Sequence, residues 1–268
     1  MKSRPSLPIA LTIAGSDSGG GAGAQMDLKT FAALGVHGTS AVTCLTAQNP
    51  SEVTAVHAVP PKFLRAQLEA VFAELRPAAV KTGMLFNAKL VREVVAFWKH
   101  LPAKSRPPLV VDPVMVATSG ARLLQPAAIK TLLIDLLPLA TLVTPNLDEA
   151  EILVGRPLKT VDDLHAAAVQ IRLQYGCAAL VKGGHLRGTG QATDVFFDGE
   201  SGLTLSVPFI RGVTTHGTGC AYSAAITGYL ALGLPLPQSV EMAKTHITQA
   251  ISQSLRIGKH TTLNPFWS

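Results

Sequence analysis

The chain has 268 residues, of which 47% are hydrophobic and 15% are charged. This length and composition suit an ordered globular protein with a large buried core, and they exclude a disordered or fibrous chain. The net charge of +6 comes from scattered Lys and Arg residues with few aromatic residues for stacking on bases. We therefore expect a solvated, mildly basic surface and no nucleic-acid partner.

The first apolar stretch begins close to the first residue. Lys2 and Arg4 precede it, as in a signal peptide, but Pro5 and Pro8 interrupt it. We expect residues 9–13 to form the first strand instead. The apolar runs reach at most about ten residues, whereas a membrane-spanning helix needs about 20, so we expect no membrane segment.

Short Val- and Ile-rich segments alternate along the chain with helical patterns, which is typical of βαβ units around a mostly parallel sheet. The predicted strands are residues 9–13, 40–46, 79–82, 109–111, 142–144 and 179–181. Two apolar helix faces are expected to cover a sheet: Leu64, Leu68, Val71, Phe72 and Leu75, and then Leu90, Val91, Val94, Val95 and Trp98. Residues 194–197 and 203–207 should form a hairpin through a Gly-containing turn. No linker or repeat divides the sequence, so we expect one α/β domain over residues 1–268.

Three cysteines, Cys44, Cys177 and Cys220, form no paired spacing. An odd number without such spacing argues against a disulfide framework and a zinc site. It favours a reducing compartment, and we expect the cytoplasm.

A Gly-rich segment, residues 14–23, follows the first predicted strand and opens a helix. The backbone there can approach a ligand closely. The segment fits the dinucleotide pattern weakly, because no acidic residue lies about 20 positions further on to hold a ribose. The sequence also contains no GxxxxGK[ST] motif, so bound ATP would have to be held in another way.

The strongest local signal is the segment 215–220, in which glycines precede the N-terminus of a helix rich in small residues. Unpaired amides and the positive end of the helix dipole form an anion hole there, suited to a phosphoryl group in transfer. Cys220 lies in the first turn, where its pKa should fall, so that a thiolate could accept a proton from a substrate hydroxyl. The alternative is a small buried cysteine that only packs.

Polar residues follow several other predicted strands, at positions that border the ligand cleft of α/β proteins. Asn146 and Glu149 are three residues apart and offer the oxygen ligands that Mg²⁺ prefers, although the same spacing is typical of a helix cap. Lys182 could contact a phosphate as a point charge. Gln48 could hydrogen-bond both edges of a heterocycle or simply lie in a turn.

Three further residues complete the expected cleft. Asp112 follows a hydrophobic strand, Met84 would form a flexible apolar wall, and Asp27 lies on the first helix within reach of the same pocket. His185 and His216 show no metal-ligand spacing, and we assign neither a catalytic role.

Taken together, these segments closely resemble the hydroxymethylpyrimidine/phosphomethylpyrimidine kinases of thiamine biosynthesis. The resemblance runs nearly end to end, through residues 14–17, 20–23, 27–31, 46–49, 81–85, 112–115, 144–149, 182–185 and 215–220. It implies a ribokinase-like, three-layer fold with a central, mostly parallel sheet flanked by helices. It also implies two successive phosphorylations by Mg-ATP, of a hydroxymethylpyrimidine and then of its monophosphate, and a homodimer.

The resemblance also implies roles for individual residues. The pyrimidine would be framed by Gly15, Asp27, Gln48, Met84 and Val114. Cys220 would be catalytic, the anion hole would be formed by Gly217, Thr218 and Gly219, and Lys182 would contact phosphate. ATP phosphates and Mg²⁺ would be organised by Asn146, Glu149 and Thr218, with Asp112 near the metal.

Two positions depart from the family pattern: Thr214 stands where an Asn is usual, and Ser18-Gly19 where many relatives have Pro-Ser. At Thr214 we expect a local change in loop hydrogen bonding without loss of activity, whereas Ser18-Gly19 bears on the mobility of the Gly-rich loop. The nearest alternative function is a pyridoxal or pyridoxine kinase of the same fold. A sugar kinase is disfavoured because its relatives carry an acidic residue at the position of Cys220, and a non-catalytic metabolite sensor would not need Lys182, Glu149 and Cys220.

Overall fold

The computed structural model describes residues 6–115, 124–184, 186, 190–213 and 216–267. His185, Thr214 and Thr215, which the sequence analysis singled out, lie outside these ranges. The strands of the main sheet are β1 (Ile9–Ser16), β2 (His37–Gln48), β3 (Val53–Ala58), β4 (Ala79–Thr82), β5 (Leu109–Val111), β6 (Leu142–Val143), β7 (Ala178–Lys182), β8 (Gln191–Phe197) and β9 (Gly202–Pro208). A separate small hairpin consists of β10 (Leu255–Ile257) and β11 (His260–Thr262).

The helices are α1 (Gly23–Ala33), α2 (Pro61–Glu74), α3 (Ala88–His100), α4 (Pro126–Thr131), α5 (Leu147–Val154), α6 (Val161–Tyr175), α7 (Thr218–Ala231) and α8 (Leu236–Ser252). Short helical turns at Ala103–Ser105, Leu132–Leu136 and Leu137–Leu139 complete the connections.

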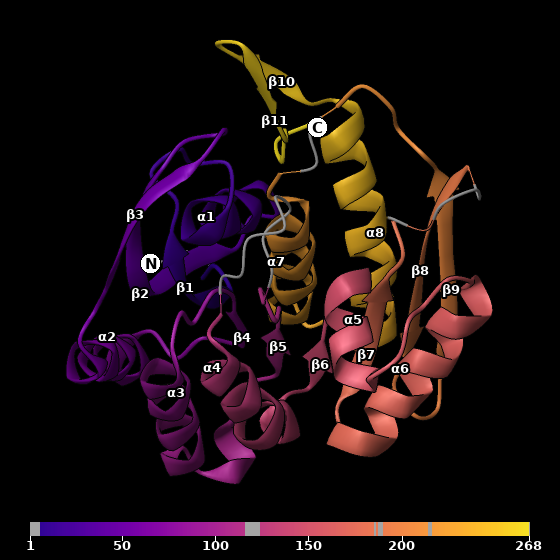
Figure 1. The fold of residues 1–268 in the computed structure, drawn as a ribbon. Coiled ribbons are helices and arrows are strands. Elements are labelled where there is room, and N and C mark those ends of the chain that lie inside the picture. Colours follow the sequence, from indigo (N-terminus) through magenta and orange to yellow (C-terminus); the bar gives the residue numbers. More distant parts are fainter. Residues whose placement is uncertain (1–5, 116–123, 185, 187–189, 214–215, 268) are drawn as a thin grey trace.

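The nine strands form one sheet in the order β3-β2-β1-β4-β5-β6-β7-β8-β9 (Figure 1). The six strands from β2 to β7 in this order are parallel to one another, whereas β3, β8 and β9 add antiparallel edges. The mostly parallel α/β sheet expected from the sequence is therefore confirmed.

Helices cover both faces of this sheet, because its central strands are apolar on both sides. In β5, Leu109 and Val111 pack into a core shared with α2 to α6, whereas Val110 between them packs into a core shared with α1, α7 and α8. Figure 1 shows α7 and α8 on one side of the sheet and α3 to α6 on the other. The result is the three-layer arrangement of the ribokinase-like fold.

The predicted elements are present, with small differences at their ends. Strands β4 and β5 match the prediction to the residue, and β8 and β9 form the predicted hairpin, in which Phe197 pairs with Gly202. All five predicted residues of the α3 face are buried. In α2 the prediction is wrong for Leu75, which follows the last helical residue and is 39% exposed.

None of the helices in the described part of the chain is long and apolar enough to cross a membrane. The three cysteines are free, and Cys44 and Cys177 are buried.

Candidate active site

The predicted site residues gather at one edge of the sheet, where the parallel strands end. The chain runs from β1 through α1 to β2 on one side of β1, and it later returns to β4 on the other side. Strand order thus reverses between β1 and β4, and ligands of open α/β sheets bind at such switch points. The loops after β1 and β4 and the N-terminus of α7, which packs on both strands, meet here.

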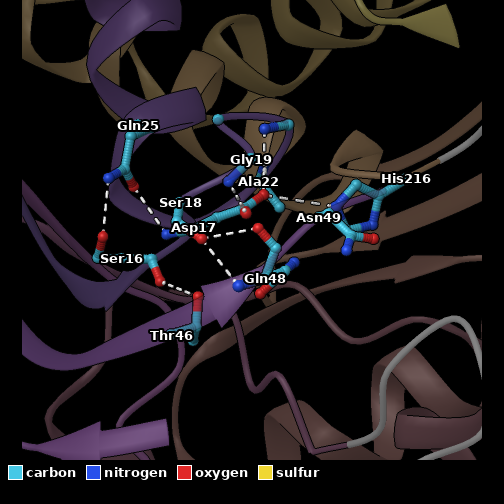
Figure 2. A network of polar contacts seen from close by, with 12 residues as sticks. Ser16, Asp17, Ser18, Gly19, Ala22, Gln25, Thr46, Gln48, Asn49 and His216 are labelled. Atoms are coloured by element: carbon cyan, nitrogen blue, oxygen red, sulfur yellow. Dashed lines mark hydrogen bonds and ion pairs between the residues drawn. The ribbon is translucent and has the colours of Figure 1, made fainter. Parts of the chain in front are cut away.

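Asp17 organises the Gly-rich loop that follows β1 (Figure 2). Its carboxylate accepts hydrogen bonds from the backbone amides of Gly19 (2.8 Å), Gly21 (3.0 Å) and Ala22 (2.8 Å). Nε2 of His216 lies 3.5 Å from Asp17 Oδ2. Burial alone would raise the pKa of Asp17, but the bonds from His216 and the amides outweigh it, and the pKa is lowered. A loop predicted only as Gly-rich is thus held in one shape by a carboxylate.

The same loop is joined to the end of β2. Ser18 Oγ donates to the carbonyl oxygen of Gln48 (2.7 Å) and accepts from the Gln48 amide (2.8 Å). Thr46 Oγ1 donates to the carbonyl oxygen of Ser16 (2.7 Å). These bonds place the half-buried Gln48 side by side with the Gly-rich loop (Figure 2).

The N-terminus of α7 approaches the Gly-rich loop as closely as a backbone can. Gly217, the N-cap residue, has a φ of +81°, and a Cβ atom at this position would lie 1.9 Å from the carbonyl oxygen of Gly21. Only glycine, which has no Cβ, fits such a contact. Thr218 begins the helix, and its hydroxyl is buried without a hydrogen-bond partner. A buried polar group of this kind at a helix N-terminus suits a bound anion.

A positive charge lies beside this helix end. A Cβ atom on Gly219 would lie 3.2 Å from Nζ of Lys182, the last residue of β7. The same Nζ is 3.4 Å from Oδ1 of Asp112, and Ser223 Oγ donates to Asp112 Oδ2 (3.1 Å). The structure therefore brings the predicted Lys182, Asp112 and Gly219 together at the first turn of α7.

Asn146 and Glu149 form a capping box at the start of α5, which is the alternative that their spacing left open. Asn146 Oδ1 accepts from the Glu149 amide (2.9 Å), and Glu149 Oε2 accepts from the Asn146 amide (3.0 Å). Glu149 Oε1 also accepts from the amide of Met115 (3.0 Å). Burial raises the pKa of Glu149 to about 7, opposed by Lys182 and reinforced by Asp112. Both carboxylate oxygens of Glu149, which was predicted to lie at the metal, thus accept hydrogen bonds from backbone amides.

Asp27 lies in a fully buried cluster. It is 0% exposed, with Lys81 Nζ 2.8 Å from its Oδ1 and Thr12 Oγ1 donating to its Oδ2 (2.6 Å). Burial alone would lower the pKa of Lys81, but Asp27 outweighs it, and Lys81 stays protonated. Asp27 therefore does not line an open surface, and no role was predicted for Lys81.

Cys220 is half-buried in the first turn of α7, as predicted, but the predicted lowering of its pKa is wrong. Burial raises the pKa of its thiol to about 12. Lys81 and a hydrogen bond from the Gly23 amide lower this pKa, whereas Asp27 and Asp112 raise it. The helix N-terminus alone therefore does not produce a thiolate, because desolvation of the charged form is the larger effect.

The remaining predicted substrate residues surround the same switch point. A Cβ atom on Gly15 would lie 3.7 Å from the Met84 side chain and 2.8 Å from Cys44 Sγ, so a larger residue at this position would force the Cys44 side chain to shift. Val114 follows β5 with a φ of +44°, an outlier for a β-branched residue. Such strain is typical of functional sites, where the surroundings hold it in place.

A cavity of about 230 Å³ lies between the Gly-rich loop and the β10–β11 hairpin. Its walls include Asp17, Gly21 and His216 from the loop side and Lys259 and His260 from the hairpin. His216 belongs to the predicted segment 215–220 but was assigned no catalytic role. His260 and the hairpin were not predicted to border the site, since only the fold brings residues this far apart in the sequence together. Within the ranges that the structure covers, no three His, Cys, Asp or Glu side chains are grouped to hold a metal ion.

The sheet order and the glycine-led start of α7 beside the switch point fit an α/β small-molecule kinase of the ribokinase-like class. Residues 17–264 match the protein family described as phosphomethylpyrimidine kinase. A hydroxymethylpyrimidine/phosphomethylpyrimidine kinase of Synechococcus elongatus is 48% identical over 253 residues, which cover 94% of this chain and 95% of that protein. The chain therefore belongs to the phosphomethylpyrimidine kinase family.

Solved structures agree with this assignment. A phosphomethylpyrimidine kinase from Clostridium difficile has a TM-score of 0.79 and 43% identity, over 90% of this chain and 98% of that one. A pyridoxal kinase from Bacillus subtilis, solved as an ADP complex, has a TM-score of 0.86 and 37% identity, over 96% of this chain and 98% of that one. The fold is thus shared by kinases named for two different rings.

The contact between Gly217 and Gly21 predicts a large cost for Gly217→Ala. Strain at positive φ and overpacking against the Gly21 carbonyl should together lower the free energy of unfolding by about 3 kcal/mol. Gly155→Ala is the matched control, because Gly155 has a φ of +74° with no atom within 4 Å of an added Cβ. It should cost about 1 kcal/mol, from φ strain alone. Equal losses in urea denaturation would show that the close approach is absent in solution.

The raised pKa of Glu149 predicts a stability that depends on pH. A carboxyl with a folded-state pKa of about 7 and an ordinary value of 4.5 contributes stability that is present below pH 4.5 and is lost as the pH rises through 7. The free energy of unfolding of the wild type should therefore fall by about 3 kcal/mol relative to Glu149→Gln between pH 4.5 and 8. Glutamine can still cap the helix. Any remaining difference in the free energy of unfolding between the two proteins should therefore be the same at every pH. Parallel denaturation curves across this range would contradict the burial of an ionisable Glu149.

Proposed function

We propose that the protein transfers the γ-phosphoryl group of ATP to hydroxymethylpyrimidine, and then a second one to the resulting monophosphate, as a step of thiamine biosynthesis. The observation that carries this proposal is the first turn of α7, where Lys182 Nζ lies against Gly219 beside the buried, unpartnered hydroxyl of Thr218. A lysine and free amides at a helix N-terminus stabilise the charge that develops on a phosphoryl group in transfer. The names of the relatives in the family support the choice of substrate.

Phosphate would be held by the helix end and Lys182. Gly217, Thr218 and Gly219 stand at the start of α7, where a helix leaves its first amides without an intrahelical partner, and Thr218 Oγ1 would supply a further donor. The ion pair of Lys182 with Asp112 is long, at 3.4 Å. Lys182 could therefore turn from the carboxylate to a phosphate oxygen without breaking a tight contact.

Mg²⁺ would enter with ATP and would neutralise phosphate charge. Asp112 is the carboxylate beside Lys182, and it is the residue that we assign to the metal. Glu149 would act from further away, because both of its oxygens already accept backbone hydrogen bonds. Asn146 would then fix the start of α5 near the nucleotide phosphates. Mg²⁺ commonly takes one or two carboxylates and completes its shell with phosphates and water, which suits this sparse donor set.

The pyrimidine would bind at the switch point between β1 and β4. Gly15 faces the Met84 side chain there, 3.7 Å from where a Cβ on Gly15 would stand, and the half-buried Gln48 and Val114 follow neighbouring strands. Gln48 can donate to and accept from the ring. Asp27 would act on the ligand only after a rearrangement or through its neighbours, since it is fully buried.

In the chemical step the substrate hydroxyl oxygen would attack the γ-phosphorus, the bond to the bridging oxygen of ADP would break, and the hydroxyl proton would pass to Cys220. Because burial raises the pKa of this thiol to about 12, the thiol would first have to lose its own proton to solvent. After the transfer, Cys220 would release the substrate's proton to solvent. Most of the rate would come from in-line positioning and charge stabilisation. Cytoplasmic location and homodimer formation remain predictions.

A substrate panel tests the proposal and the pyridoxal alternative together. ADP release from Mg-ATP is measured with hydroxymethylpyrimidine, with its monophosphate and with pyridoxal as separate acceptors. We expect turnover of both pyrimidines, with pyridoxal much slower. Faster turnover of pyridoxal would assign the protein to the reaction named for the Bacillus subtilis structure. No turnover of any acceptor would overturn the proposed function.

The role of Cys220 predicts a selective defect in Cys220→Ser. A serine hydroxyl ionises far less readily than a thiol, so kcat should fall about 100-fold, as for loss of a general base. Pyrimidine affinity, measured by calorimetry, should change less than about twofold, because the side chain keeps its size. Cys177→Ser is the control, since Cys177 is a buried core cysteine before β7. Unchanged turnover in Cys220→Ser would remove Cys220 from the mechanism.

A further inference from the structure

A buried ion pair joins α8 to β8, the strand that pairs with the strand of Lys182. Nζ of Lys244 lies 2.7 Å from Oδ2 of Asp194 and donates to the carbonyl oxygen of Ala192 (3.0 Å). Asp194 is 3% exposed and Lys244 is 7% exposed. Such a pair adds little net stability compared with apolar residues of similar volume, but loss of one member leaves an unpaired buried charge. The neighbours of the pair therefore decide what it does.

Asp194 is the cross-strand partner of Lys182. The two residues lie directly opposite each other in the antiparallel register of β7 and β8. Side chains at such opposite positions project from the same face of the sheet. Phe196, two residues further along β8, packs in the core shared with α7 and α8, so this is the face that those helices cover. Lys182 and Lys244 thus share one face of the sheet with Asp194.

Asp194 also fixes the backbone beside Lys182. Its Oδ1 accepts a hydrogen bond from the Gly183 amide (3.1 Å), which the amide shares with the carbonyl oxygen of Thr193 (3.0 Å). The amide of Lys182 itself donates to the carbonyl oxygen of Pro145 (2.9 Å). The peptide groups on both sides of the Lys182 Cα atom are therefore held in place, and so is the direction in which its side chain leaves the strand.

Two carboxylates lie near the Lys182 side chain. Its Nζ is 3.4 Å from Oδ1 of Asp112 and 3.2 Å from where a Cβ on Gly219 would stand. Of the ion pairs in the described part of the chain, the one that contains Asp194 is made with Lys244. Burial raises the pKa of Asp194, and Lys244 opposes this effect more strongly than Lys182 does. Lys244 thus occupies a carboxylate that would otherwise attract Lys182.

We propose that Lys244 is a positioning residue of the phosphoryl-transfer site, which holds Asp194 and so keeps the ammonium group of Lys182 directed at the first turn of α7. This inference rests on the proposed function, because it concerns the affinity of that helix end for ATP. A purely structural pair would stabilise the pairing of β7 with β8, and its loss would act on nucleotide binding whether or not Lys182 is present. A pair that acts through Lys182 needs that side chain for its effect.

The test is a double-mutant cycle on the binding of Mg-AMP-PCP, a nonhydrolysable analogue of Mg-ATP, measured by calorimetry. Lys244→Met should weaken binding by about fivefold or more, because the unpaired Asp194 then attracts Lys182. In the Lys182→Met background, the same change should alter the affinity by less than about twofold, since the group on which it acts is gone. Equal losses in the two backgrounds would show a general loosening of the fold and would overturn the proposal.

The two members of the pair should also act differently. Asp194→Asn removes the charge that competes for Lys182 and keeps an oxygen for the Gly183 amide, so the affinity should stay within about twofold of the wild type or increase. The double variant Lys244→Met/Asp194→Asn should regain most of the affinity lost in Lys244→Met. Equal weakening by both single variants would contradict the proposed role, and so would a double variant as weak as Lys244→Met.

Val195→Ala is the matched control for stability. Val195 follows Asp194 in β8 and pairs with Val181 of β7, but it packs on the opposite face of the sheet, in the core shared with α2 to α6. The cavity should lower the urea midpoint by weakening the same pair of strands. The affinity for Mg-AMP-PCP should stay within about twofold of the wild type. A loss as large as that in Lys244→Met would show that weaker strand pairing alone explains the effect.

Circular dichroism shows whether each variant is folded. If Lys244→Met does not fold, Lys244→Gln replaces it in the cycle, because glutamine can still donate to Asp194 without a positive charge. If that variant also does not fold, Asp194→Asn decides the question. An affinity within about twofold of the wild type supports the proposal, and a loss of about fivefold or more overturns it.

Turnover separates this inference from the proposed function. If the wild type phosphorylates hydroxymethylpyrimidine, Lys244→Met should raise KM for ATP by about fivefold or more, with a smaller change in KM for the pyrimidine. Binding of Mg-AMP-PCP without turnover of either pyrimidine would refute the proposed substrate alone, because the cycle does not depend on it. Absence of Mg-AMP-PCP binding in the wild type would refute both.

Discussion

The site depends on one close backbone contact, between Gly217 at the start of α7 and the carbonyl oxygen of Gly21 in the Gly-rich loop. This contact sets where the helix begins, and the helix in turn places the Thr218 hydroxyl, the Gly219 amide and the Cys220 thiol in its first turn. Asp17 completes the arrangement, since it binds both the amides of the Gly-rich loop and His216, the residue before Gly217. Two loops far apart in the sequence are thereby held as one unit.

Electrostatics then sets the chemical character of the site. Burial raises the pKa of both Cys220 and Glu149, because it disfavours their charged forms. Lys81 lowers the pKa of Cys220 and Lys182 lowers that of Glu149, but burial has the larger effect in each case. The site is thus a balance between burial, which excludes water from a reacting phosphoryl group, and a few placed charges. A bound nucleotide adds negative charge to this balance, and its metal ion adds positive charge.

Much of this architecture could be predicted from the sequence, because local signals and the final contacts agree. The apolar strands, the hairpin at Asp198–Gly199 and the glycines before α7 all follow rules of short range. The edge strand β3 was not predicted, since most of its side chains are exposed and its sequence carries no apolar alternation facing a core. Lys81 and the Asp17–His216 pair were also not assigned roles, because only the fold reveals which charges are buried together. The pKa of Cys220 was predicted wrongly for the same reason. Its position in the first turn of a helix can be read from the sequence, but its burial depends on the whole fold.

The cavity beside the Gly-rich loop has a further consequence for the order in which the protein matures. One wall is formed by residues 17–21 and another by residues 257–262, which are separated by most of the chain. Closing a loop of this length costs more chain entropy than closing a short one, so the two walls meet once the intervening sheet holds them close together. A polypeptide still leaving the ribosome would therefore have its helix end and Gly-rich loop in place before the hairpin closes this side of the cavity. Completion of the hairpin is thus a natural last step in maturation.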